Sequence, residues 1–282
     1  MFKLNFFILL SINIFIIISK EIFNFFNNKC FNENLFYYNH CPLYYEYEKG
    51  VSICVTAYNA VRFIKNTLNS IINQTWFKNH NNYEIILGID GCNETLKYVN
   101  TIKNNYKNLI VIMMKENKGT YITTNTIMTI AKYDHLIRFD SDDIMYPNLV
   151  QKVMTQNKKY DMIRFKMKNY NENTKKNLKK EAYGQFMMKH WVFDYFGGFM
   201  PWRCSSDEEF TIRVFKFIKI LKLKDTLLLR KIHSNSLTQS KETNFLSKVR
   251  KNNIIYIKQK TKKIKNIEDA RIKKIIDDYY EI

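Results

Sequence analysis

Four consecutive residues, Asp140-Ser141-Asp142-Asp143, have the types and spacing in this 282-residue sequence that point most directly to chemistry. Closely spaced carboxylates can hold a hard divalent cation that keeps several waters and takes its other ligands from a diphosphate. An EF-hand calcium loop is excluded, because Met145 and Gln151 stand where its glycine and glutamate are required, counting from Asp140. The alternative is a solvated turn in which Asp143 caps a following helix.

The elements that would position this cluster alternate between strand and helix. Apolar, β-branched runs predict strands at residues 51–56, 84–89, 109–113 and 135–139. Apolar residues at helical spacing predict helices over residues 61–72 and 120–131. The alternation predicts an α/β fold with a central, mostly parallel sheet and helices on both faces.

Polar residues follow three of these strands, at Asn59, at Asp90 and at the acidic cluster that begins with Asp140. The carboxyl ends of parallel strands meet at one edge of a sheet, and ligands bind there in such folds. We therefore expect these polar residues to converge on one rim. For Asp90 the alternative is a turn-forming pair with Gly91.

Six segments resemble, in the same order and with similar gaps, the inverting GT-A glycosyltransferases of the family 2 type. The resemblance covers roughly residues 51–240, and it is carried by residues 51–59, 88–93, 117–121 with Asn125, 137–143, 206–213 and 230–238. It implies a Rossmann-like GT-A fold. It also implies transfer of a sugar from a UDP- or GDP-sugar donor to a glycan, protein or lipid acceptor.

The resemblance implies a donor site built from the first four segments. In similar enzymes, the turn after the first strand and the acid matching Asp90 bracket the nucleobase, and the residue matching Asp140 faces the ribose and the metal. This sequence has one acid before Gly91 where many relatives have two, and Cys92 where serine is usual. Donor binding is expected of Ala57, Tyr58, Asn59, Asp90, Gly119, Asn125, Asp140 and Ser141.

The resemblance further implies a Mn²⁺ or Mg²⁺ ion held by Asp140, Asp142 and, from the sixth segment, His233. Such an ion would act as a Lewis acid toward the departing nucleoside diphosphate. A neutral imidazole can supply a ligand of this kind. The alternative for His233 is an ordinary surface position.

Asp207 matches the family's general base, which takes the proton of the acceptor hydroxyl during in-line attack. Ser206 stands where relatives carry glutamate, and Glu208 and Glu209 offer competing carboxylates. These acids also suit the first turn of a helix, where they interact favourably with its dipole. Acceptor binding is expected of Gly198, Phe199 and Trp202. A core position is the alternative for Trp202.

The amino terminus carries an apolar, uncharged run at residues 4–19, flanked by Lys3 and Lys20. This run is slightly shorter than the roughly 20 residues that span a bilayer. We expect an uncleaved anchor that makes a single-pass membrane protein with a luminal catalytic domain; a cleaved signal peptide and a cytosol-facing orientation are the alternatives. The expected organisation is an anchor at 1–23, a stem at 24–50, a catalytic domain at 51–240 and a basic helical segment at 241–282.

The chain has a formal net charge of +19 and a pI of about 9.5, which favour an anionic partner. Lysine is abundant throughout, so a general bias in composition explains the charge equally well. Between residues 241 and 265, lysines alternate with Ile, Val and Tyr. This segment either lies on an anionic membrane surface or packs as a solvated helix on the catalytic domain. Cys30 and Cys41 could pair in an oxidising lumen.

Two other functional classes fit parts of the sequence. One is a GT-A-like nucleotidyltransferase; the other is a non-enzymatic, basic membrane-associated protein that binds nucleic acid or lipid. Nucleic acid is not an expected partner, because RRM, KH and zinc-finger signatures are missing from the sequence. The sequence also has no Walker, GxGxxG or HExxH motif, which excludes the kinases, dehydrogenases and zinc hydrolases that depend on them.

Overall fold

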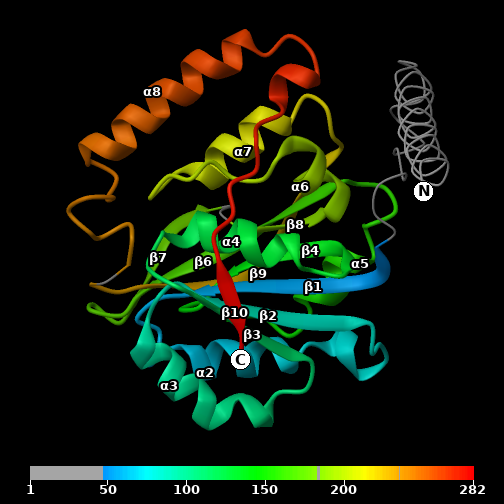
Figure 1. Cartoon of the computed structure of the whole chain (residues 1–282), viewed down its shortest axis with the longest axis vertical. Coiled ribbons are helices and arrows are strands. Elements are labelled where there is room, and N and C mark those ends of the chain that lie inside the picture. The colour runs from blue at the N-terminus through cyan, green and yellow to red at the C-terminus, as the bar shows by residue number, and fades with distance from the viewer. Residues whose placement is uncertain (1–46, 183–184, 235) are drawn as a thin grey trace, which may run out of the picture. The chain divides into compact units, whose positions relative to one another are not determined.

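A computed structural model describes residues 47–182, 185–234 and 236–282 (Figure 1). The predicted anchor at 1–23, most of the predicted stem, and Cys30 and Cys41 lie outside the described residues. Among the residues that are described, none of the helices is both long enough and apolar enough to cross a membrane.

Four parallel strands form the centre of the sheet, in the order β3, β2, β1, β4. They are β1 (Glu48–Ala57), β2 (Tyr83–Ile89), β3 (Leu109–Met114) and β4 (Tyr133–Asp140). All of β2 and the last eight residues of β1 are buried, as expected for strands covered on both faces. The four predicted strands are confirmed. β1 begins earlier than predicted, so residues 48–50 belong to the sheet and not to the stem.

The other half of the sheet is mixed, which corrects the prediction of a mostly parallel sheet. The full order is β10-β3-β2-β1-β4-β8-β6-β9-β5, with β7 paired to β6. β8 runs antiparallel to both β4 and β6, whereas β6 and β9 are parallel. The strands are β5 (Ile144–Met145), β6 (Met162–Asn171), β7 (Lys176–Ala182), β8 (Phe186–Lys189), β9 (Ile220–Ile232) and β10 (Tyr279–Glu281).

Helices cover both faces of the sheet, as predicted (Figure 1). Successive residues of a strand point to opposite faces. Ile53 and Val55 therefore join one apolar core, and Cys54 joins the other. The first core includes α2 (Ile64–Ile72), α3 (Asn93–Ile102) and α5 (Leu149–Met154). The second includes α4 (Thr120–Thr129), α6 (His190–Phe196) and α7 (Ser206–Val214). Short 3₁₀ turns lie at Thr75–Lys78, Lys103–Asn105 and Glu268–Ala270.

The carboxyl-terminal segment returns to the sheet after its helix. The predicted basic helix is present as α8 (Lys248–Lys263). The chain then runs back across α4 and ends in β10, which pairs antiparallel with β3 (Figure 1). Residues 47–282 form one compact unit, which includes the carboxyl-terminal segment.

Arg213 in α7 ties this returning segment to the rest of the second core. Its guanidinium is buried and donates to both carboxylate oxygens of Glu209, at 2.7 and 3.1 Å. It also donates to the carbonyl oxygens of Phe196, Gly198 and Ala270, at 2.7, 2.7 and 2.9 Å. All its donor positions are therefore used for internal hydrogen bonds.

Replacing Arg213 by alanine should lower the free energy of unfolding by about 3–5 kcal/mol, because Glu209 would be left buried without its partner. Urea denaturation of the parent and of Arg213→Ala measures this difference. Lys216→Ala, at an exposed position just beyond α7, is the control and should change stability by less than about 0.5 kcal/mol. Equal stability of the two variants would contradict the role given to Arg213.

Candidate functional site

A cleft of about 940 Å³ lies at the carboxyl ends of the central strands. The pairing register places Thr56 of β1 beside both Gly88 of β2 and Asp140 of β4, so the chain leaves these strands at one level. The polar residues that follow the strands converge there, as predicted. The predicted site residues that line the cleft are Ala57, Tyr58, Asn59, Asp90, Gly119, Asp140, Ser141, Asp142, Asp207 and His233.

Asn125 does not belong to this lining, which corrects its expected donor role. Its side chain is fully buried and makes three hydrogen bonds within the protein. The Nδ2 atom donates to the carbonyl oxygens of Phe199 and Ile275, at 2.9 and 3.0 Å. The Oδ1 atom accepts from the backbone N–H of Phe199 at 2.9 Å. Asn125 therefore joins α4 to the loop after α6 and to the carboxyl-terminal segment.

The residues expected to bind the acceptor also lie outside the cleft lining. Phe199 is fully buried against Phe210. Gly198 has a φ of +73°, and a Cβ there would lie 2.6 Å from the Asn125 side chain. Trp202 packs edge-on against Tyr256 of α8, with ring centroids 5.3 Å apart. Glycine and aromatic residues suit a sugar pocket and a packed core equally well, and here packing decided their positions.

Two of the clustered carboxylates are held by the protein itself. Asp140, at the end of β4, accepts from the Arg138 guanidinium at 2.8 Å and from the Gln185 amide at 3.2 Å. Asp143 is buried and accepts from the same Gln185 amide at 2.6 Å, and from the backbone N–H of Lys231 at 3.0 Å. These contacts fix the turn that carries the third carboxylate, that of Asp142.

Asp142 reaches across the cleft to the segment that follows β9. Its Oδ2 atom lies 3.0 Å from Nε2 of His233, whose ring stacks on Phe63 with centroids 4.5 Å apart. A carboxylate oxygen and an imidazole nitrogen side by side are a suitable pair of ligands for a divalent cation. No three His, Cys, Asp or Glu side chains gather as a ligand set anywhere in the described part of the chain. The pair therefore fits an ion that takes its other ligands from a diphosphate and water.

Carboxyl groups are concentrated at this point. Burial raises the pKa of the Asp143 carboxyl well above its ordinary value, and the neighbouring charges of Asp142 and Asp140 add to that effect. Burial also raises the pKa of Asp140, against the opposing influence of Arg138. A cation bound beside these groups would offset their mutual repulsion.

Asp90 has a visible structural role beside the donor role expected of it. Its carboxylate accepts from the backbone N–H groups of Lys118 and Gly119, at 2.8 and 2.9 Å. Gly119 has a φ of +99°, a conformation that glycine adopts readily. Tyr58, at the turn after β1, leaves about half of its side chain exposed at the cleft. Asp90 thus shapes the loop before α4, and its contact with a nucleobase stays a prediction.

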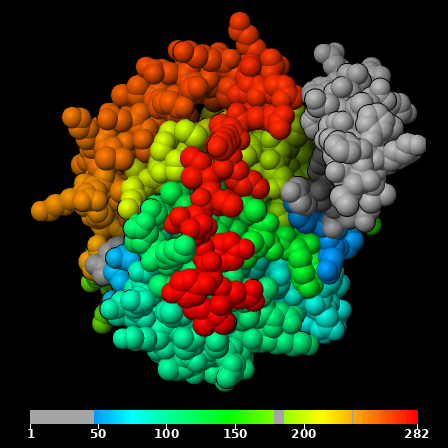
Figure 2. Space-filling model, viewed as in Figure 1, coloured from blue at the N-terminus to red at the C-terminus, as the bar shows by residue number. Residues whose placement is uncertain are grey.

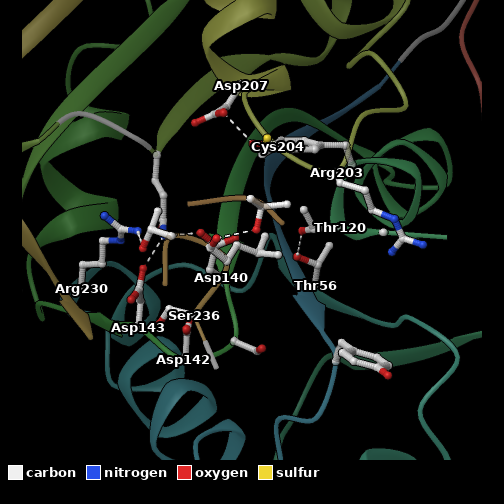
Figure 3. A pocket seen from close by; sticks show the side chains of 18 of the residues that line it. Thr56, Thr120, Asp140, Asp142, Asp143, Arg203, Cys204, Asp207, Arg230 and Ser236 are labelled. Atoms are coloured by element: carbon white, nitrogen blue, oxygen red, sulfur yellow. Dashed lines mark hydrogen bonds between the residues drawn. The ribbon is translucent and has the colours of Figure 1, made fainter. Parts of the chain in front are cut away.

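Asp207 lies in the first turn of α7 and faces the same cleft (Figure 3). Its Oδ1 atom accepts a 2.6 Å hydrogen bond from the hydroxyl of Tyr121 in α4. The guanidinium of Arg138 lies over the Tyr121 ring, 5.4 Å from its centroid. Because Arg138 also binds Asp140, a continuous chain of contacts joins the acidic cluster to Asp207.

Sequence reasoning missed several residues of this site. Arg138 carried a usable signal, because it stands two positions before Asp140 in a strand, and residues two apart share a face. Gln185 carried none, and although Tyr121 belongs to the matching segment 117–121, nothing in the sequence indicated its contact with the distant Asp207. Arg203 was also missed; it lines the cleft together with Arg230, which belongs to the sixth matching segment, and Figure 3 shows the two on opposite sides of Asp140. Guanidinium groups placed in this way suit a diphosphate.

Comparison with known proteins gives a family match and several relatives. The sequence profile of glycosyl transferase family 2 matches residues 52–211. An uncharacterized glycosyltransferase of Haemophilus influenzae is 34% identical over 125 residues, which are 44% of this chain and 35% of the relative. The poly(ribitol-phosphate) β-N-acetylglucosaminyltransferase TarP of Staphylococcus aureus is 29% identical over 105 residues, which are 36% of this chain and 31% of TarP. The chain thus spans about a third of the length of these two relatives.

Among solved structures, residues 1–349 of S. aureus TarS in complex with UDP-GlcNAc superpose with a TM-score of 0.57. The identity is 18%, and the match covers 66% of this chain and 60% of that one. The same TarS fragment in complex with UDP gives a TM-score of 0.56. At 18% identity, this likeness shows only that the two proteins share a fold.

Proposed function

Because the profile match spans more than half of its length, this chain belongs to glycosyl transferase family 2 and is a glycosyltransferase, and we propose that it transfers a sugar from a UDP-sugar to an acceptor hydroxyl with inversion at the anomeric carbon. The observation that carries the proposal is the meeting of Asp142, His233 and Asp207 in one cleft at the carboxyl ends of the strands. The complexes of TarS with UDP and UDP-GlcNAc favour UDP over GDP. Family membership removes the nucleotidyltransferase and non-enzymatic alternatives.

Asp142 and His233 are the residues that would hold a Mn²⁺ or Mg²⁺ ion, beside the diphosphate of the donor. When bound, the ion would neutralise charge on the departing nucleoside diphosphate as a Lewis acid. Arg203 and Arg230 would bind phosphate oxygens from either side. The exposed ring of Tyr58 would provide a face for the nucleobase. Specific binding of the diphosphate and base would leave the anomeric carbon directed toward Asp207.

Asp207 would act as the general base for the acceptor. The Tyr121 hydroxyl occupies Oδ1, which leaves Oδ2 for the proton of the attacking hydroxyl. A carboxylate so placed contributes on the order of 10²- to 10⁴-fold to the rate. Attack from the side of Asp207, opposite the departing diphosphate, would invert the configuration of the transferred sugar.

A donor screen tests the proposal. The full chain is incubated with UDP-, GDP- and CMP-sugars in the presence of Mn²⁺, Mg²⁺ or EDTA, and the released nucleotide is measured. We expect release from a UDP-sugar that requires the cation. Release that is unchanged in EDTA would contradict the metal site, and release from GDP- or CMP-sugars alone would contradict the choice of UDP.

The hydrogen bond from Tyr121 to Asp207 makes a separate prediction. Tyr121→Phe should lower kcat about tenfold with little change in UDP affinity, because it removes a charge-assisted hydrogen bond that orients the base. Steady-state kinetics and UDP titration measure the two quantities. Tyr195→Phe is the matched control, since it removes a phenol donor to Glu268 away from the cleft. An unchanged kcat for Tyr121→Phe would contradict the positioning role.

A further inference from the structure

The helix α8 is strongly basic at both of its ends, with residues 252–257 uncharged between them. It contains no Asp or Glu, and its basic residues are Lys248, Arg250, Lys251, Lys258, Lys260, Lys262 and Lys263. Within the described part of the chain, none of the salt bridges involves a lysine of this helix. The charge of α8 is therefore not neutralised by acidic side chains of the helix itself or by ion pairs with the rest of the described fold.

One side of α8 is fixed to the protein. The Arg250 guanidinium donates to Ser205 Oγ at 3.2 Å and to the carbonyl oxygen of Thr243 at 2.9 Å. The Asn253 amide donates to the carbonyl oxygen of Cys204 at 2.9 Å, and Ile257 is buried. Because this side of α8 faces the protein, the residues on the opposite side of the helix face outward.

The opposite side carries an exposed stripe at spacings of three and four residues. Side chains at this spacing lie on one face of a helix. The stripe consists of Lys248, Lys251, Ile255, Lys258 and Lys262, all of them exposed. Figures 1 and 2 show α8 along one edge of the catalytic unit, with its outer side uncovered in this view.

Apolar side chains accompany these lysines. Leu246, in the turn before α8, is 79% exposed, and Ile255 within the stripe is 53% exposed. Phe245 is also exposed, but it lies under the Arg250 guanidinium on the inner side and lines the cleft. A soluble polyanion would need only the positive charges, whereas exposed apolar side chains gain free energy by entering an apolar phase. Lysines beside exposed Leu and Ile therefore favour the surface of an anionic bilayer, which attracts the positive charges and offers an apolar boundary beneath them.

We propose that α8 and the preceding turn, residues 245–263, are a membrane-docking surface for bilayers that contain anionic phospholipid. The lysine stripe lies against the headgroups, and Leu246 and Ile255 enter the boundary with the acyl chains. The inner side of α8 contacts Ser205, which lines the cleft, so docking holds the cleft close to the bilayer. The surface is separate from the proposed transfer chemistry.

Vesicle flotation of the full chain tests this proposal. The vesicles contain phosphatidylcholine alone or phosphatidylcholine with phosphatidylserine, and the partition constant of each protein is measured at low and high salt. The triple variant Lys251→Glu, Lys258→Glu, Lys262→Glu should lose at least about 100-fold of the partitioning into phosphatidylserine vesicles, since each lysine near such a surface contributes a factor of about five. The double variant Leu246→Ser, Ile255→Ser should lose about tenfold on the same vesicles.

The matched control replaces three other surface lysines by glutamate, so that it changes the net charge of the protein by the same amount. Lys65, Lys97 and Lys107 are exposed on and beside α2 and α3, at the opposite side of the catalytic unit from α8 (Figure 1). Their triple replacement by glutamate should change partitioning by much less than the replacement in α8. Asp142→Ala should partition like the parent, which separates this proposal from the proposed function. All variants keep the same amino terminus, so its contribution cancels.

Two results would overturn the proposal. One is equal loss of partitioning in the two charge variants, which would show a general effect of net charge. The other is unchanged partitioning of Leu246→Ser, Ile255→Ser together with tight, α8-dependent binding to heparin, which would identify a soluble polyanion as the partner.

Discussion

Asp207→Asn is expected to lower the rate of sugar transfer by roughly 10²- to 10⁴-fold while the protein still binds UDP. Asparagine keeps the size of the side chain and can still accept from the Tyr121 hydroxyl, but it cannot take a proton from the acceptor. The loss should therefore fall on kcat and not on donor affinity. The proposed metal ligands Asp142 and His233 belong to other segments, so the replacement leaves them in place.

The neighbouring acids provide the control for this experiment. Glu208 also lines the cleft, whereas Glu209 is committed to its ion pair with Arg213. Glu208→Gln should therefore reduce transfer much less than Asp207→Asn. If Glu208→Gln loses more of the transfer rate than Asp207→Asn in the same assay, the base is Glu208. Loss of UDP binding in Asp207→Asn would place Asp207 in the donor site instead.

Asp142→Ala is expected to lower cation-dependent turnover by roughly 100-fold or more, because it removes the carboxylate partner of His233. Asp140 and Asp143 cannot easily replace it, since Arg138, Gln185 and the backbone of Lys231 hold their oxygens. Turnover measured against Mn²⁺ concentration should show a much weaker response to the ion.

Asp225→Ala is the control for this second prediction. Asp225 is a half-exposed carboxylate paired with Lys152 on the surface, and its loss removes the same charge from the protein. It should leave both turnover and the Mn²⁺ response close to those of the parent. An Asp142→Ala protein with the parent's Mn²⁺ response would show that the ion is held elsewhere or is not used.

The central part of the fold could be predicted because its sequence signals are local. The strands β1 and β2 contain runs of apolar, mostly β-branched residues, and β4 has Leu136, Ile137 and Phe139 just before the acidic cluster. The strands in the mixed half of the sheet gave weaker sequence signals. β9 alternates lysine with leucine and is only partly buried, and β10 has three exposed residues whose pairing with β3 depends on the path of the whole segment before it.

The residues of the candidate site could also be predicted only in part. Asp140, Asp142 and Asp207 could be placed because they follow or begin elements that the sequence predicts. Asn125 could not, because only tertiary contacts with Phe199 and Ile275 show that its amide is already satisfied. Tyr121 was missed for the same reason. Its role depends on a contact with Asp207, which is 86 residues away in the sequence.

Calorimetric titration of the full chain with UDP, with Mn²⁺ and with EDTA, tests the metal-dependent donor site most directly. The parent should bind UDP at least about tenfold more tightly with Mn²⁺, because Asp142 and His233 would hold the ion beside the diphosphate. Asp142→Ala should show no such gain. UDP binding by the parent that is equally tight with Mn²⁺ and with EDTA would contradict the account.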